Sequence, residues 1–202
     1  IFLEEMSRRG VVEAGSKELV MPIVMKERIA HRAPGNAVLQ KGDFLIMDFG
    51  IDFQGYCSDI ARTVYFLKDG ETKAPKAIQE KFDAAHEAIT RASQAIHPGV
   101  IGYEVDQVAR EYLLSVGMPE ITHATGHQLG QFEHDGGAMF APRWERYGNA
   151  PYGMIEENMV LTLEPTILND NDYSILCEED ILVTKTGAEF LSKRQDELIL
   201  IS

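Results

Sequence analysis

The chain has 202 residues, the length of one large domain or two small ones, and its hydrophobic content of 45% is normal for a globular protein. With 32 acidic and 19 basic residues its net charge is −13, which argues against nucleic acid or an anionic membrane as a partner. Such a charge usually serves solubility, but some of the carboxylates can instead be metal ligands. The two cysteines, Cys57 and Cys177, form no disulfide framework and favour a cytoplasmic location.

The sequence contains neither a membrane-spanning apolar run nor a signal-peptide pattern. It begins at Ile1 without an initiator Met, so we expect a piece of a longer protein, truncated at its N-terminus. Because no low-complexity linker and no sharp change in composition divides it, we predict one domain over residues 1–202.

A helix end and an irregular strand are predicted first. Residues 2–9 are acidic and then basic, with apolar positions between, which is typical of the last turns of a helix that ends at Gly10. Residues 19–25 form an apolar run interrupted by Pro22, which favours an irregular or edge strand. Residues 28–35 then predict a loop.

A β-hairpin is predicted over residues 41–64. The sequence DFQG at residues 52–55 has Asp first and Gly last, which is typical of a type I turn. If its two middle residues form the loop, Asp48 and Asp59 face each other, although a one-residue bulge would change this register. Because two neighbouring carboxylates repel each other, we expect a shared proton or a metal ion to neutralise them.

Two amphipathic helices follow the hairpin. Apolar residues recur at steps of three and four across residues 75–96 and again across residues 102–116, which predicts one buried stripe on each helix. His86 and His97 belong to this helical layer, and we interpret both as structural or solvent-facing.

The second half of the chain is predicted to be mainly loops and strands. Residues 121–137 are rich in Gly and His without a clear period, and a long polar and aromatic loop covers residues 138–153. Residues 159–168 and 173–184 predict two strands around a polar turn. A last short strand pair is predicted over residues 189–201.

The second hairpin repeats the acidic pattern of the first. Glu164 and Glu178 are equally distant from the middle of its turn, so they are also expected to face each other. Acidic residues inside apolar strands are costly unless they are paired or bind a metal. Four carboxylates and one imidazole suit two ions of Mn²⁺, Co²⁺, Fe²⁺ or Zn²⁺. The candidate imidazoles are His31, His123, His127 and His134.

These residues, in this order, resemble the metal ligands of the pita-bread metallopeptidases, which include methionine aminopeptidase, prolidase and aminopeptidase P. The ligand-type residues are Asp48, Asp59, His127, Glu164 and Glu178. The surrounding sequences MDFG, GYCSDIARTV, GHQLGQFEHD, TLEP and CEEDILVTKTG also match, from about residue 31 to the C-terminus. The resemblance implies an α+β pita-bread (creatinase/aminopeptidase) fold, in which helices pack on the outer face of a curved antiparallel sheet.

The resemblance also implies a role for each ligand. Asp48 would chelate one metal, Asp59 and Glu178 would bridge both, and His127 with Glu164 would complete the other. Two divalent ions are therefore expected as cofactors, Mn²⁺ first, with Co²⁺, Zn²⁺ or Fe²⁺ as alternatives.

The implied reaction is hydrolysis of the N-terminal residue from a peptide substrate by a water that bridges the two metals. Glu164 would carry the proton toward the leaving nitrogen. His31 and His134 would donate hydrogen bonds to the substrate, and His123 would lie near it. The chain is most similar to the Xaa-Pro peptidases, prolidase and aminopeptidase P, in which an N-terminal domain often supports a homodimer.

Several alternatives stay open on the sequence. Methionine aminopeptidase-like specificity, a non-catalytic binding module and a metal-free creatinase-like enzyme share the fold. Arg62 matches an arginine of the Xaa-Pro branch or forms a surface salt bridge. Cys57 has a redox or inhibitory role or is a small buried hydrophobe. Departures from the aminopeptidase P pattern at Ala124, Leu168 and Leu176 bear on specificity.

Overall fold

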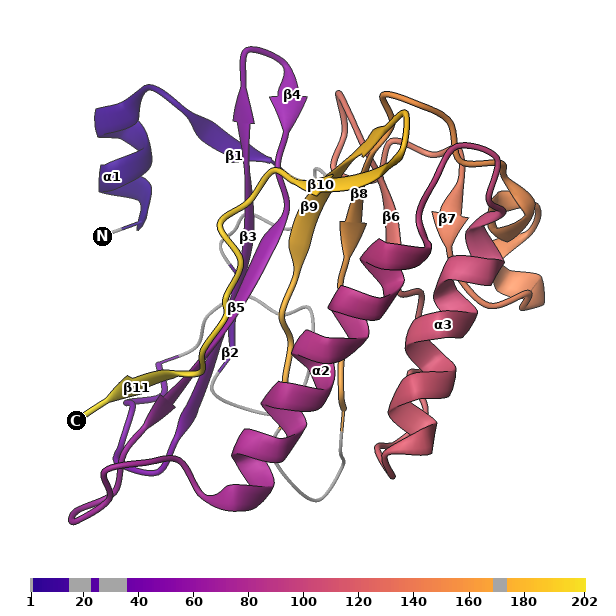
Figure 1. Cartoon of the computed structure of the whole chain (residues 1–202). Helices are drawn as coiled ribbons and strands as arrows, with labels where there is room; N and C mark the ends of the chain where they lie inside the picture. The colour runs from indigo at the N-terminus through magenta and orange to yellow at the C-terminus, as the bar shows by residue number, and fades with distance from the viewer. Residues whose placement is uncertain (1, 15–22, 26–35, 169–173) are drawn as a thin grey trace.

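In the residues that the structure describes, two β-sheets and two long helices make up an α+β fold, which confirms the predicted class (Figure 1). The computed structural model describes residues 2–14, 23–25, 36–168 and 174–202. The first sheet contains β1 (Val12–Ala14), β2 (Ile23–Met25), β3 (Phe44–Phe53), β4 (Tyr56–Cys57), β5 (Ile60–Phe66) and β11 (Ile199–Ile201). The second contains β6 (Gly126–Leu129), β7 (Met139–Phe140), β8 (Val160–Leu163), β9 (Glu179–Thr184) and β10 (Gly187–Phe190). The helices are α1 (Phe2–Arg9), α2 (Lys76–Ala95) and α3 (Gly102–Ser115), with 3₁₀ turns η1 (Glu145–Tyr147) and η2 (Ala150–Tyr152).

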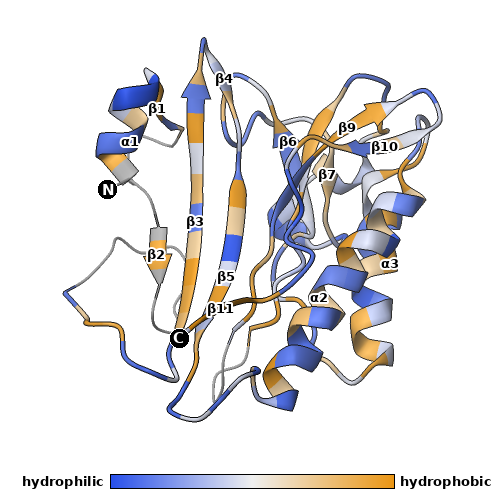
Figure 2. Ribbon diagram, turned by 60° about the vertical axis from the view of Figure 1, so that its left-hand side comes forward, coloured by the Kyte–Doolittle hydropathy of each residue, from blue (hydrophilic) through white to orange (hydrophobic). Residues whose placement is uncertain are grey.

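Helices α2 and α3 cover one face of the second sheet (Figures 1 and 2), and their bounds agree with the prediction to within one residue. Their buried stripes include Phe82 and Leu113, which join Leu161, Leu163 and Ile181 of the sheet in one core. Because side chains alternate along a strand, Thr162 and Glu164, which alternate with Leu161 and Leu163, point to the opposite, open face of the sheet. That face carries the candidate site.

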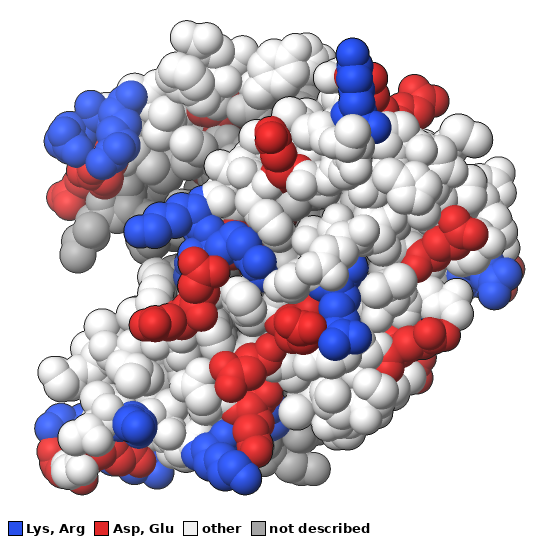
Figure 3. Space-filling model, viewed as in Figure 1, with Lys and Arg blue, Asp and Glu red and all other residues white. Residues whose placement is uncertain are grey.

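The helix-covered face shows acidic and basic side chains intermixed (Figure 3). On α2, for example, Lys76 lies 3.2 Å from Glu80, and Arg91 lies 2.8 Å from Glu87. Such exposed ion pairs contribute little to stability. None of the helices in the described part of the chain is both long and apolar enough to cross a membrane.

The second hairpin has the predicted register. Leu163 pairs with Glu179, and an isolated bridge joins Ile167 to Ile175, so Glu164 lies opposite Glu178. The regular strands β8 and β9 are shorter than predicted, and the predicted turn at residues 169–172 lies outside the described residues. This hairpin therefore brings two carboxylates to the open face.

The first hairpin has a different register from the predicted one. Phe53 pairs with Tyr56, so the loop is Gln54-Gly55, and φ values of 57° and 84° make it a type I′ turn instead of type I. Asp48 consequently pairs with Ala61, not with Asp59. A shift of two residues leaves each side chain on the same face of the sheet, so the two carboxylates remain on one side.

The C-terminal strands also differ from the prediction. Residues 189–201 do not form a strand pair, because β10 pairs with β9 whereas β11 pairs in parallel with β5. Gln195 explains the crossing between the sheets: its amide side chain donates to the Thr63 carbonyl at 2.7 Å and accepts the Thr63 N–H at 3.0 Å. The predicted strand at 19–25 is described only as β2, which pairs with β3, and the loop at 28–35 lies outside the described residues.

Gly50 is required where β3 passes the segment that carries Asp59. A Cβ atom at Gly50 would lie 2.0 Å from the Ser58 carbonyl oxygen, which is far inside van der Waals contact. We expect Gly50→Ala to lower the free energy of unfolding by about 2 kcal/mol or more. Urea unfolding measures this, with Gly187→Ala as the control, because the nearest atom to a Cβ there is 3.7 Å away. Equal stability of the two variants would contradict the prediction.

Candidate metal centre

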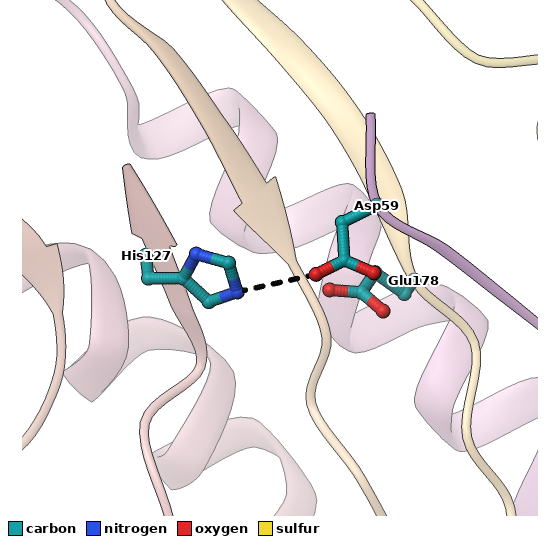
Figure 4. Close-up of side chains that lie close together, drawn as sticks. All are labelled: Asp59, His127 and Glu178. Atoms are coloured by element: carbon teal, nitrogen blue, oxygen red, sulfur yellow. Dashed lines mark ion pairs between the residues drawn. The ribbon is translucent and has the colours of Figure 1, made fainter. Parts of the chain in front are cut away.

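Three buried side chains from separate segments converge on the open face (Figure 4). Asp59 lies between β4 and β5, His127 lies on β6, and Glu178 directly precedes β9. One potential ligand atom from each lies within 4.8 Å of the others, and the residues are only 5%, 4% and 2% exposed. The chain therefore gathers one imidazole and two carboxylates around a common point, an arrangement that suits a cation.

The His127 ring presents a lone pair to two carboxylates. Its Nε2 lies 3.6 Å from Asp59 Oδ2 and 3.6 Å from Glu164 Oε1, which is too long for a hydrogen bond. Burial and the neighbouring His134 lower the pKa of His127 to about 3, so the ring is neutral. Its Nδ1 faces the Gln128 carbonyl at 3.5 Å, which assigns the remaining proton to Nδ1. The Nε2 lone pair facing these oxygens favours a cation between them.

The carboxylates of the site repel one another. Burial, the charge of Asp48 and the charge of Glu133 raise the pKa of Glu164 to about 8. Burial also raises the pKa values of Asp59 and Glu178 well above their ordinary range, and Asp48 adds to both shifts. Asp48 is therefore close enough to the other acidic residues for its charge to act on them. Without a cation, the site keeps protons on carboxyl groups that would be ionised in water.

The donor set fits divalent transition ions. Asp59 Oδ1 is buried and has no hydrogen-bond partner among the described residues, which leaves a lone pair for a ligand. Oxygen donors with one imidazole suit Mn²⁺, Co²⁺, Fe²⁺ and Zn²⁺. Of the five predicted ligands, Asp59, His127 and Glu178 form the tight cluster, Glu164 lies against His127, and Asp48 is coupled to them by charge.

Hydrogen bonds from the main-chain N–H groups fix three of the proposed ligands in place. The His127 N–H donates to Thr162 Oγ1 at 3.1 Å, which ties β6 to β8 beside the site. The Glu164 N–H donates to the Thr125 carbonyl at 2.7 Å, and the Glu178 N–H donates to the Ala61 carbonyl at 3.2 Å. The last bond joins the two sheets, so the site lies at their junction.

The three other predicted histidines are placed differently. His134 is exposed, and its ring stacks on that of His127 with centroids 3.9 Å apart and planes inclined by 13°. His123 is half-buried, with Nδ1 2.6 Å from the Ala124 carbonyl oxygen. His31 lies outside the described residues. Of the three, His134 therefore has the position expected of a side chain at the mouth of the site.

Two acidic residues at the site were missed by the sequence analysis. Burial raises the pKa values of Glu133 and Asp180 to about 7, and Asp180 Oδ2 accepts the Asp59 N–H at 3.3 Å. Only their positions in the sequence could have indicated them. Glu133 directly precedes His134, and Asp180 follows Glu178 by two residues, which places both side chains on one face of the strand.

Arg62 forms a largely buried network, and the alternative of a surface salt bridge is wrong. Its guanidinium lies 3.0 Å from Glu179 Oε2, with the two side chains 16% and 2% exposed. It also donates to the carbonyls of Ala61, Glu178 and Lys193 at 2.6 to 2.8 Å. These contacts join β5 of the first sheet to residues 178, 179 and 193 at the junction with the second sheet.

The cysteines are both free thiols. Cys177 is buried, whereas Cys57 is half-buried and donates to the Gln131 carbonyl at 3.7 Å. Burial raises the pKa of Cys57 above its usual value, which disfavours the reactive thiolate. This favours the interpretation of Cys57 as a small packing residue.

Comparison with known proteins gives consistent matches. Metallopeptidase family M24 matches residues 2–185. An uncharacterized peptidase of Staphylococcus aureus is 34% identical over 163 residues, which cover 80% of this chain and 43% of that protein. The Xaa-Pro dipeptidase from Bacillus anthracis has a TM-score of 0.79 at 28% identity, over 98% of this chain and 53% of the other. The X-Pro aminopeptidase from Thermotoga maritima has a TM-score of 0.77 at 26% identity, over 95% and 48%. The chain thus spans about half the length of the proteins it matches.

Proposed function

Because the chain belongs to metallopeptidase family M24 and has its pita-bread fold, we propose that it carries the catalytic centre of a dinuclear metal-dependent peptidase. The observation that carries the proposal is the convergence of His127 Nε2 with the buried carboxylates of Asp59, Glu164 and Glu178. This arrangement is unfavourable for an empty protein core and favourable for bound cations.

The proposed ligands are the five residues identified in the sequence. Asp59 and Glu178 would bridge two ions, Asp48 would bind one, and His127 with Glu164 would bind the other. Mn²⁺ is the proposed native ion. Bound divalent cations would lower the pKa of a water molecule and polarise the scissile carbonyl.

The protein residues would direct protons and substrate. The Glu164 carboxylate would accept a proton during the attack and return it to the leaving nitrogen. His134, at the exposed end of the stacked pair, would donate a hydrogen bond to the substrate carbonyl. Roles for His31 and His123 in substrate binding are proposed on their sequence match. The excess of carboxylates, including Glu133, would favour the free ammonium group of a peptide N-terminus.

Specificity for an N-terminal Xaa-Pro bond is proposed from the relatives. The two similar structures are named as an Xaa-Pro dipeptidase and an X-Pro aminopeptidase. A panel of Met-Xaa, Xaa-Pro and Xaa-Pro-Yaa peptides with added Mn²⁺ tests this. We expect cleavage of the proline peptides, abolished by EDTA. Fastest cleavage of Met-Xaa would instead indicate methionine aminopeptidase-like specificity, and bound metal without cleavage of any peptide would indicate a binding module.

A cytoplasmic location is proposed because both cysteines are free thiols, as in reducing compartments. The homodimer implied by the resemblance and the single domain over residues 1–202 stay predictions. Sedimentation of the protein with and without Mn²⁺ measures the oligomeric state.

A further inference from the structure

Asp180 is a buried carboxylate that is not among the proposed ligands. It is 6% exposed and pairs with Thr162 in the ladder between β8 and β9. Because it follows Glu178 by two residues, its side chain points to the same open face as that of Glu178. It therefore lies beside the metal centre, on the strand that supplies one of the bridging carboxylates.

The side chain of Asp180 holds the main chain of Asp59. Residues 58 and 59 interrupt the strand between β4 and β5. The Ser58 N–H still reaches the Ile51 carbonyl at 3.0 Å, whereas the Asp59 N–H donates to Asp180 Oδ2 at 3.3 Å. A side chain of the second sheet thus accepts the main-chain N–H of the residue that enters the metal centre from the first sheet.

Asp180 is itself fixed independently of Asp59. Its N–H donates to Ser192 Oγ at 3.2 Å, and its carbonyl accepts the Leu191 N–H at 2.8 Å. Its second oxygen, Oδ1, is buried without a hydrogen-bond partner among the described residues. A buried carboxylate with only one satisfied oxygen lowers the stability of the fold, and an apolar residue of similar shape would avoid this cost.

We propose that Asp180 is a positioning residue, which sets Asp59 at the distance from Glu178 that a shared divalent cation requires. The proposal rests on the metal centre proposed above. Residues that orient metal ligands commonly hold a ligand's side chain, and their loss weakens metal binding 10- to 100-fold or so. Asp180 would do the same through the main chain of the ligand, across the junction of the sheets.

Two substitutions separate this role from a role in folding. Asp180→Leu keeps the branched shape but removes the acceptor, whereas Asp180→Asn keeps an acceptor oxygen. The control is Glu71→Gln, since Glu71 is a half-buried acceptor for Tyr65 Oη at 2.9 Å, away from the site. Calorimetric titration with Mn²⁺ gives the affinity of each protein, and thermal unfolding in EDTA gives its metal-free stability.

We expect Asp180→Leu to bind Mn²⁺ roughly 10- to 100-fold more weakly, with an unfolding temperature in EDTA equal to or above that of the wild type. Asp180→Asn should bind within about threefold of the wild type, and Glu71→Gln should bind like the wild type. Wild-type affinity in Asp180→Leu would overturn the proposal, as would a misfolded Asp180→Leu or equal losses in the Leu and Asn variants. If the wild type itself binds no Mn²⁺, the proposed metal centre is refuted, and the role of Asp180 with it.

Discussion

Replacing His127 with alanine should reduce peptide hydrolysis by at least about 100-fold, the upper end of what the loss of an outer-shell partner costs a metal site. The reason is that His127 is itself a proposed ligand: its Nε2 lies 3.6 Å from a carboxylate oxygen of both Asp59 and Glu164. The variant should also bind less Mn²⁺ than the wild type, for which we expect about two ions per chain. Metal analysis and hydrolysis of an Xaa-Pro peptide measure the two effects.

His86→Ala is the matched control for this substitution. His86 is a half-buried histidine on α2 that lies 3.3 Å from Asp196, and it has no place in the proposed centre. Its variant should keep wild-type hydrolysis and metal content. Equal metal content and equal activity in the His127 and His86 variants would remove His127 from the ligand set. No activity in any of the three proteins, with metal bound, would favour the binding module.

The metal-free protein should lose stability as the pH rises from 6.5 to 8. Burial and Asp48 raise the pKa of Glu164 to about 8, against 4.5 for an ordinary Glu, so the folded state binds more protons than the unfolded state in this range. His127, whose pKa is lowered to about 3, acts in the opposite direction, but only below its ordinary pKa of 6.5. Above pH 6.5 the carboxyl groups therefore decide the sign.

The expected loss is about 2 kcal/mol or more between these two pH values, since each pKa unit corresponds to about 1.4 kcal/mol. Urea unfolding in EDTA at pH 6.5 and 8 measures it, and Glu164→Gln should reduce the pH dependence. Saturating Mn²⁺ should reverse the trend, because metal ligands must be deprotonated. Stability that is constant or rises with pH in EDTA would show that these carboxyl groups are not held protonated.

The two hairpins show what a sequence pattern predicts well and what it does not. Glu164 and Glu178 stand in apolar surroundings, at equal distances from the middle of a polar turn. Their position opposite each other in the hairpin follows from that symmetry. The first hairpin has the same acidic pattern, but its turn begins one residue later than predicted. Gln54 adopts a positive φ, which residue type does not indicate. The register was therefore wrong by two residues, and only the side of the sheet was predicted correctly.

Contacts between distant segments were beyond prediction from local pattern. The order of candidate ligands indicated a metal centre, but the approach of Asp59, His127 and Glu178 depends on how two sheets pack. The same packing sends β11 back to pair with β5, and it buries Arg62 against Glu179. None of these contacts leaves a periodic signal, because each is decided by the tertiary fold.

The hydrogen bond between Asp59 and Asp180 spans 121 residues of sequence, and this separation has a consequence for folding. Contacts of such long range form late, after the entropy of closing a large loop has been overcome. A nascent or partly folded chain can therefore hold its hairpins and helices before the proposed metal centre has formed. Metal ions would capture the finished fold instead of nucleating it, and their uptake would mark the last step of refolding.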